Sequence, residues 1–283
     1  MTMSQPQSIF IDNTELSETN QLLLLSDDSF VTDLDSIFKY PQDLTKTIDE
    51  RAELFFPDII GHTAIKRQLY RALLRDNRLV NILLIGAPAN AKTLFMKCIE
   101  RQCNGVIFYD ASTGSSGAGL IEILRLNPQC KILIIDELAE LKRNDIEVLR
   151  GLANDGRVSK TLKKQFINFR IENLKIFGTT NNPTKLSKPI KSRFQIYLIP
   201  EYTDQEFKDV VKFCLKKQNI IKDDTLINEL AHAMIHFNIK NIRNALACCS
   251  LVHEGDNYEV IKRTIMEYIE NDGSKCNTNF NEE

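Results

Sequence analysis

Residues 80–94 read VNILLIGAPANAKTL, and this stretch decides the fold that we predict for the whole chain. Residues 82–85 are four branched apolar side chains in a row, which is typical of a short strand buried on both faces of a parallel sheet. Residues 86–93 follow the Walker A pattern G-x-x-x-x-G-K-[ST], in which backbone N–H groups and a helix N-terminus surround an anion. We therefore predict a strand, a phosphate-binding loop and a helix, with one departure from the pattern.

The departure is Ala91, which stands where the pattern has glycine. Because this residue opens the helix, we expect a negative φ there, at which a methyl group is tolerated. Lys92 would reach the β- and γ-phosphates of a nucleotide as a positive charge, and the Thr93 hydroxyl would ligate Mg²⁺. The nucleotide-binding residues predicted from this segment are Gly86, Ala87, Pro88, Ala89, Asn90, Ala91, Lys92, Thr93 and Leu94.

A second apolar strand, residues 131–137, ends in two carboxylates in the manner of a Walker B motif. Asp136 lies 44 residues after Lys92, and one strand and one helix are predicted between them. Parallel strands of an open α/β sheet present their carboxyl ends at the edge where ligands bind. Asp136 would therefore hold Mg²⁺, mainly through water, and Glu137 would position and polarise the attacking water.

A third buried strand, residues 174–178, runs into the polar sequence Thr-Thr-Asn. A polar side chain at this strand end would lie between the two Walker elements, where it could hydrogen-bond the attacking water. We expect Asn181 in this role, with Thr180 as the alternative.

The chain as a whole predicts an α/β fold in four segments. Residues 1–50 would be an acidic, mostly disordered arm, or else a peptide that docks on a partner of unknown identity. Residues 51–200 would form a P-loop NTPase core in which helices sandwich a parallel sheet. Residues 201–271 would form a small all-α lid, which begins with a capping box, and residues 272–283 a polar tail.

Within the core, residues 158–162 and 165–171 predict a hairpin. We expect Lys160, Lys163 and Lys164 at its tip, where they would contact nucleic-acid phosphates. The alternative is a hairpin tip that faces only solvent.

Composition narrows the class of protein and its location. Residues 1–50 hold ten acidic residues and two lysines, a net charge of −8, so the total of −2 leaves +6 for the remainder. Such a basic body permits contact with nucleic acid without demanding it. No apolar run approaches the ~20 residues of a membrane span, and the amino terminus lacks the features of a signal peptide. The seven cysteines are scattered, as is usual in a reducing cytosol, and we expect a cytoplasmic protein without a membrane partner.

In order and spacing, these motifs resemble those of the AAA+ ATPases over about residues 55–270. The motifs that carry the resemblance are the Walker A and B segments, Thr179-Thr180-Asn181, Ser192-Arg193-Phe194 and Asn241-Ile-Arg243. Within that superfamily the chain is most similar to the RuvB-type Holliday-junction helicases, which have an Ile-Gly-Gln-like opening where residues 60–62 read Ile-Gly-His. It also resembles the minichromosome-maintenance helicases in its Ala-Lys-Thr Walker A and in the loop from Thr113 to Leu120.

Two departures from these families concern the substrate. RuvB-type proteins carry a DNA-binding winged helix after the lid, and we expect none in the 283 residues of this sequence. The segment from residue 126 to residue 131 is too short for the helical insert of the minichromosome-maintenance type.

The resemblance implies cofactors, an assembly and two further site residues. The cofactors would be ATP and Mg²⁺, and the assembly a ring of identical subunits, expected to be a hexamer. Arg193 would project into the site of the next protomer as an arginine finger, with Lys191 as the alternative. Arg243 would approach the γ-phosphate from within its own chain.

Three functions compete at this point. The first is an oligomeric, Mg²⁺-dependent ATPase motor that acts on DNA in the manner of a branch-migration helicase. The second is a protein-remodelling AAA+ motor, although residues 110–119 contain no aromatic residue of the kind such motors present to their substrates. The third is a nucleotide-dependent switch or scaffold, which the presence of Lys92, Glu137 and Arg193 disfavours. We expect the first.

Overall fold

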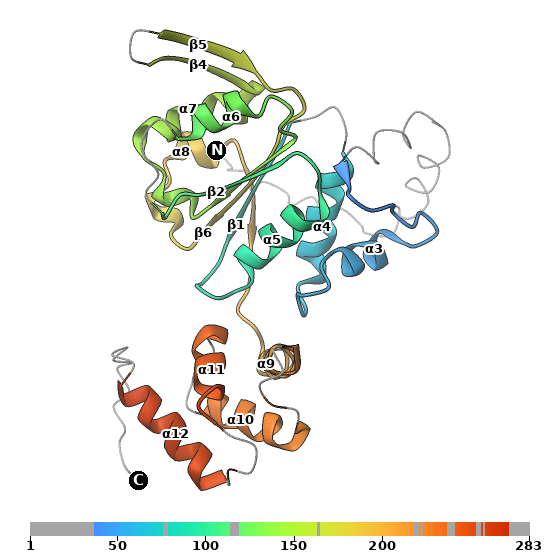
Figure 1. The fold of residues 1–283 in the computed structure, drawn as a ribbon, viewed down its shortest axis with the longest axis vertical. Helices are drawn as coiled ribbons and strands as arrows, with labels where there is room; N and C mark the ends of the chain where they lie inside the picture. Colours follow the sequence, from blue (N-terminus) through green and yellow to red (C-terminus); the bar gives the residue numbers. More distant parts are fainter. Residues whose placement is uncertain are drawn as a thin grey trace, which may run out of the picture.

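A computed structural model of the chain describes residues 37–75, 79–113, 119–162, 165–217, 221, 223–236, 241–252, 256 and 258–271. At its centre is a sheet of five parallel strands in the order β2-β3-β6-β1-β7 (Figure 1). These strands are β1 (Val80–Ile85), β2 (Val106–Asp110), β3 (Ile132–Asp136), β6 (Lys175–Thr180) and β7 (Gln195–Leu198). Strands β3 and β6 are buried along their whole length, as their apolar sequences predict.

Helices cover both faces of this sheet. On one face lie α3 (Ile48–Phe55), α4 (Thr63–Leu74) and α5 (Lys92–Gln102), and on the other α6 (Gly119–Leu126), α7 (Arg143–Asp155) and the short α8 (Lys188–Lys191) (Figure 1). Two turns of 3₁₀ helix, η1 (Leu138–Glu140) and η2 (Pro183–Lys185), follow the carboxyl ends of β3 and β6. The predicted α/β sandwich is confirmed.

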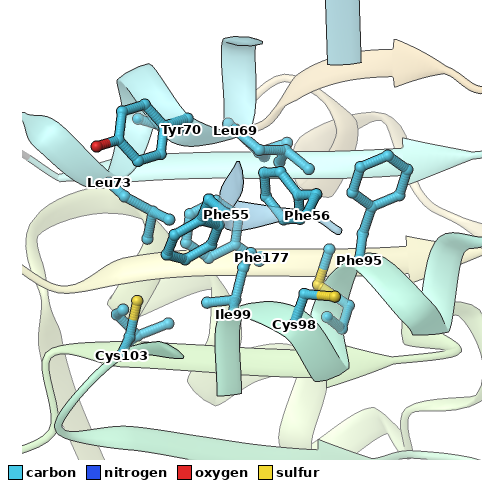
Figure 2. Packing of buried hydrophobic residues seen from close by; sticks show 14 of the residues in the cluster. Phe55, Phe56, Leu69, Tyr70, Leu73, Phe95, Cys98, Ile99, Cys103 and Phe177 are labelled. Atoms are coloured by element: carbon cyan, nitrogen blue, oxygen red, sulfur yellow. The ribbon is translucent and has the colours of Figure 1, made fainter. Parts of the chain in front are cut away.

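Aromatic side chains fill the interface between the sheet and the first group of helices. Figure 2 shows Phe55 and Phe56, at the end of α3, packed among side chains of α4, α5 and the sheet. The Phe56 ring meets the Phe95 ring at 5.2 Å in an edge-to-face arrangement, which is a favoured geometry for buried aromatic pairs. This packing fixes α5, whose first residue is Lys92, against the sheet.

The structure corrects the predicted boundary of the N-terminal arm. Residues 37–50 are not disordered: Ile37 and Phe38 are buried in the same core, and Phe38 forms a β-bridge with Cys103. The boundary at residue 50 falls inside α3, which begins with a capping box between Thr47 and Glu50. Ile37 and Phe38 therefore anchor this segment to the core, although two apolar residues are too few to show a periodicity in the sequence. The remainder of the arm, residues 1–36, and the polar tail, residues 272–283, lie outside the described residues.

An antiparallel hairpin of β4 (Arg157–Leu162) and β5 (Gln165–Arg170) projects from the core at the end opposite the C-terminal helices (Figure 1). Gly156 begins it with a φ of +72°, and a Cβ at this position would lie 2.1 Å from the carbonyl oxygen of Ile171. Only glycine fits this position without displacing the backbone.

After β7 the chain is helical and has a hydrophobic core of its own. The helices are α9 (Asp204–Lys217), α10 (Asp224–His236), α11 (Ile242–Cys249) and α12 (Tyr258–Asn271). The predicted capping box is present before α9, where the Thr203 N–H donates to Glu206 at 2.9 Å and the Glu206 N–H donates to Thr203 at 3.3 Å. A carboxylate of the core, Asp58, accepts from both Arg101 of α5 and Lys217 of α9, so it joins the core to the helical part.

Candidate active site

The loop between β1 and α5 has the form of a phosphate cradle. Its first residue, Gly86, passes so close to the end of β7 that a Cβ would lie 2.9 Å from the Ile199 carbonyl oxygen. Lys92 is buried, and its ammonium group donates to the carbonyl oxygens of Gly86 at 2.9 Å and Ala87 at 2.6 Å. The lysine is thus held over the loop by groups that a bound phosphate would compete with.

The expectation of a negative φ at Ala91 is wrong. Ala91 has a φ of +56°, and Ala89, two residues earlier, has a φ of +63°. An L-residue in this left-handed region costs roughly 1–2 kcal/mol relative to its usual conformations, which explains why glycine is usual at position 91. The loop must turn its N–H groups inward before α5 can begin, and that turn requires the left-handed conformation whichever residue is present.

Thr93 and Asp136 meet at the base of the loop. The Thr93 hydroxyl donates to the two carboxylate oxygens of Asp136 at 2.9 and 3.3 Å, although the residues come from different elements, α5 and the end of β3. Asp136 is 8% exposed. A hydroxyl and a carboxylate that converge in this way are the oxygen ligands that Mg²⁺ prefers, so these two residues fit a metal of that kind.

Glu137 and Asn181 lie together at the carboxyl ends of β3 and β6. The side-chain amide of Asn181 donates to one carboxylate oxygen of Glu137, and its backbone N–H lies 3.3 Å from the other. The alternative, Thr180, is buried and its hydroxyl accepts the N–H of Asn182 at 3.1 Å instead. Of the two candidates, the geometry therefore favours Asn181.

One cavity of about 300 Å³ joins these groups to the helical part of the chain. Its wall contains the loop and the first residues of α5, with Glu137 and Asn181 on one side and Ile242 and Arg243 of α11 on the other. Asn241 caps α11 by accepting the N–H groups of Arg243 and Asn244 at 2.9 and 3.4 Å, which sets the start of the helix beside the cavity. The residues that line it are Pro88, Ala89, Asn90, Ala91, Lys92, Thr93, Leu94, Lys97, Glu137, Asn181, Ile242 and Arg243.

Charges around this cavity oppose one another. The pKa of Lys92 is lowered, mainly because the side chain is buried. The carboxylates of Glu137 and Asp136 raise it in part, and the positive charge of Arg243 lowers it further. Three cations, Lys92, Lys97 and Arg243, thus line the cavity together with the carboxylate of Glu137. An anion bound there would gain from the cations, and a metal at the base of the loop from the carboxylate of Asp136.

Arg193 lies outside this cavity. It follows α8, its guanidinium donates to the carbonyl oxygen of Pro189, and its buried Nε has no hydrogen-bond partner among the residues that the structure describes. It therefore does not line the cavity of its own chain, and its expected role at a neighbouring site stays a prediction.

The expected position of Lys160 at the hairpin tip is wrong. Lys160 is not at the tip: it lies within β4, opposite Ile167, and its ammonium group pairs with Glu147 at 3.2 Å and with the Asn144 carbonyl oxygen at 3.1 Å. Lys163 and Lys164 lie outside the described residues.

Sequence reasoning missed two residues of the site. Lys97 lies on α5 five positions after Lys92 and lines the same cavity. Thr179 is fully buried in β6, and its hydroxyl donates to the carboxylate of Asp136 and accepts the backbone N–H of Glu137. The signal for Thr179 was present, because a hydroxyl in a strand buried on both faces needs a partner.

Residues 82–202 match the family model "ATPase family associated with various cellular activities (AAA)". This stretch therefore matches the AAA family, and the predicted resemblance to the AAA+ ATPases is confirmed. The curated relatives include the Holliday junction branch migration complex subunit RuvB of Leuconostoc mesenteroides, which is 27% identical over 178 residues, 58% of this chain and 51% of that protein. The RuvB subunit of Dehalococcoides mccartyi is 26% identical over 185 residues, 62% of this chain and 53% of that protein.

A different relative is the spastin homolog of Caenorhabditis elegans, 25% identical over 176 residues, which are 56% of this chain and 33% of that protein. This chain spans about half the length of the RuvB relatives. Among solved structures, a mutant form of Thermotoga maritima RuvB has a TM-score of 0.57 at 20% identity, and the match covers 75% of this chain and 72% of that chain. At that identity the likeness concerns the fold.

Proposed function

We propose that this protein is a Mg²⁺-dependent ATPase whose phosphate-binding loop, metal-binding pair and catalytic glutamate are those predicted from the sequence. The observation that supports this most strongly is the single cavity shared by Lys92, Thr93, Glu137, Asn181 and Arg243. These residues come from separate parts of the chain, so their convergence does not follow from the Walker A segment alone.

In this proposal each side chain has a separate task. Glu137 is the general base that takes the proton of the attacking water, and Asn181 orients its carboxylate. Lys92 and Arg243 provide positive charge for the phosphate oxygens, over which negative charge spreads in phosphoryl transfer. Thr93 and Asp136 would hold Mg²⁺, which neutralises charge on the β- and γ-phosphates when bound.

We further propose that the ATPase works as a ring of identical subunits. Arg193 lies outside the cavity of its own chain and would act on that of a neighbour. Lys191, two residues earlier at the end of α8, is the weaker candidate, because it has no guanidinium fork to bind a phosphate. A hexamer is the expected size, by resemblance to AAA+ rings.

DNA is the substrate that we propose for this motor. The support is the similarity to two RuvB subunits, whose name places them in a Holliday junction branch migration complex, together with the net charge of +6 on residues 51–283. The spastin relative keeps protein remodelling as a second candidate.

Within the described residues, every helix is too short or too polar to span a membrane. We propose a cytoplasmic location.

The test is turnover of ATP by the purified chain, alone and with single-stranded DNA, forked DNA or an unfolded protein. Stimulation by DNA alone supports the DNA motor, whereas stimulation by unfolded protein alone overturns it in favour of remodelling. Glu137→Gln should abolish turnover and keep nucleotide affinity, because the amide cannot accept the proton. Lys92→Ala should instead weaken nucleotide binding. Turnover at the normal rate in Glu137→Gln would contradict the assignment of the base.

A further inference from the structure

The hydroxyl of Thr179 lies between the two Walker B acids and contacts both. It donates to Oδ1 of Asp136 and accepts the backbone N–H of Glu137 at 3.0 Å. Both contacts are made by one oxygen of a side chain with 0% exposure, so they are shielded from solvent.

The contact to Glu137 supports the backbone just beyond the end of a sheet ladder. The pairing of β3 with β6 stops at Ile135 and Gly178, so it does not extend to Glu137. Glu137 then takes the left-handed conformation, with a φ of +53° and a ψ of +52°, which turns the chain into η1. A non-glycine residue persists in this conformation only when its surroundings hold it there. The Thr179 hydroxyl is one such support at the turn itself.

The contact to Asp136 is made with Oδ1, the carboxylate oxygen that lies farther from the Thr93 hydroxyl. Thr93 lies 2.9 Å from Oδ2 and 3.3 Å from Oδ1, and Thr179 donates to Oδ1. If the Thr93 hydroxyl turns toward a metal ion, Thr179 still holds the carboxylate. Hydrogen-bond partners of this kind orient a metal-binding carboxylate and raise metal affinity.

We propose that Thr179 is a positioning residue for this ATPase, which orients the metal-binding carboxylate of Asp136 and the backbone of the catalytic Glu137 through a single hydroxyl. This inference rests on the proposed function. Thr179 touches neither nucleotide nor water in this role; it acts through the two acids.

The decisive variants keep the shape of the side chain and change only the hydroxyl. Thr179→Val removes the hydroxyl at nearly constant volume, and Thr179→Ser keeps it. Tyr109→Phe is the control, because Tyr109 lies on β2 of the same sheet, is 5% exposed and donates to Asp145, away from the nucleotide cavity. It removes a buried hydroxyl without touching the Walker acids.

Two readouts separate a positioning role from a merely structural one. The first is kcat and KM for ATP, and the second is the affinity of the ADP-bound protein for Mn²⁺, followed by electron paramagnetic resonance. Thr179→Val should lower kcat and weaken Mn²⁺ binding, each by about 10–100-fold, with KM for ATP nearly unchanged. Thr179→Ser should restore both values, and Tyr109→Phe should leave both unchanged while lowering the urea midpoint.

Wild-type kcat and Mn²⁺ affinity in Thr179→Val would overturn the inference, as would equal losses in Thr179→Val and Tyr109→Phe. Failure of the proposed function has a different signature, because wild type and Thr179→Ser would then hydrolyse no ATP. In that case the Mn²⁺ titration still tests whether Thr179 orients Asp136.

Discussion

Replacing Ala91 by glycine should release backbone strain from the phosphate-binding loop. With a φ of +56°, Ala91 occupies the left-handed region, at a cost of roughly 1–2 kcal/mol for an L-residue. Glycine removes that cost, but it loses about 0.4–1 kcal/mol through the greater freedom of the unfolded chain. It also loses the packing of a half-buried methyl group against the core. The net change should therefore be small and stabilising, from about 0 to 1 kcal/mol.

A matched control separates strain from the other two effects. Ala87 lies in the same loop and is also partly buried, but its backbone is outside the left-handed region. Ala87→Gly should therefore destabilise the protein by about 1 kcal/mol, since it gains nothing in exchange. The difference in unfolding free energy between the two variants, about 1–2 kcal/mol, is a direct estimate of the strain.

The assay is urea unfolding of the nucleotide-free protein, with fluorescence and circular dichroism followed together so that a single transition can be verified. Both variants should keep the m-value of the wild type. The urea midpoint should be lower than that of the wild type in Ala87→Gly, and equal to it or higher in Ala91→Gly. If Ala91→Gly destabilises the protein as much as Ala87→Gly does, position 91 is unstrained, and the physical account of its left-handed φ is wrong.

Three further predictions concern other parts of the chain. Burial lowers the pKa of His62 below 6.5, so the unfolded protein takes up a proton before the folded protein does. The stability of the fold should therefore decrease as the pH drops below about 6.5. In His62→Gln the urea midpoint should fall less between pH 7.5 and pH 5.5 than it does in the wild type. The hydrogen bonds from Lys217 and Arg101 lower the pKa of Asp58 below 3.8. The ionised carboxylate therefore stabilises the folded state above that pH, and this contribution is lost as the pH falls. Asp58→Asn should destabilise the protein at pH 7 and much less at pH 3. Arg193→Ala and Glu137→Gln should each be inactive alone but regain partial ATP turnover when mixed, because some interfaces then combine an intact glutamate with an intact arginine; the absence of any gain on mixing would contradict the arginine-finger role.

Much of the core and most of the nucleotide site could be predicted because both depend on local patterns. Continuous apolar runs placed β1, β3 and β6, and the two Walker motifs placed Lys92 and Asp136 at the carboxyl edge of the sheet. The topology of an open parallel sheet then brings these residues together without any knowledge of the side-chain packing.

What could not be predicted depends on contacts that are distant in sequence or on backbone geometry. The anchoring of Phe38 requires a bridge to Cys103, 65 residues later, and no local pattern announces such a contact. The left-handed φ of Ala91 follows from the shape of the loop. Its sign in the sequence was that the Walker A pattern has glycine at the position where this chain has alanine. The pairing of Lys160 with Glu147 depends on how β4 lies against α7, so a count of basic residues in the hairpin could not reveal it.

Helix α5 has a mechanical consequence beyond phosphate binding. Its 11 residues span about 16 Å, with Lys92 and Thr93 at one end and Arg101, which is paired with Asp58, at the other. Lys217 of α9 is paired with the same carboxylate, and Arg243 of α11 reaches the cavity at the opposite end of the rod. The helical part of the chain thus meets both ends of α5, through the shared carboxylate of Asp58 at one end and across the cavity at the other. A displacement of α5 would therefore change the ion pairs of Asp58 and the width of the cavity at the same time.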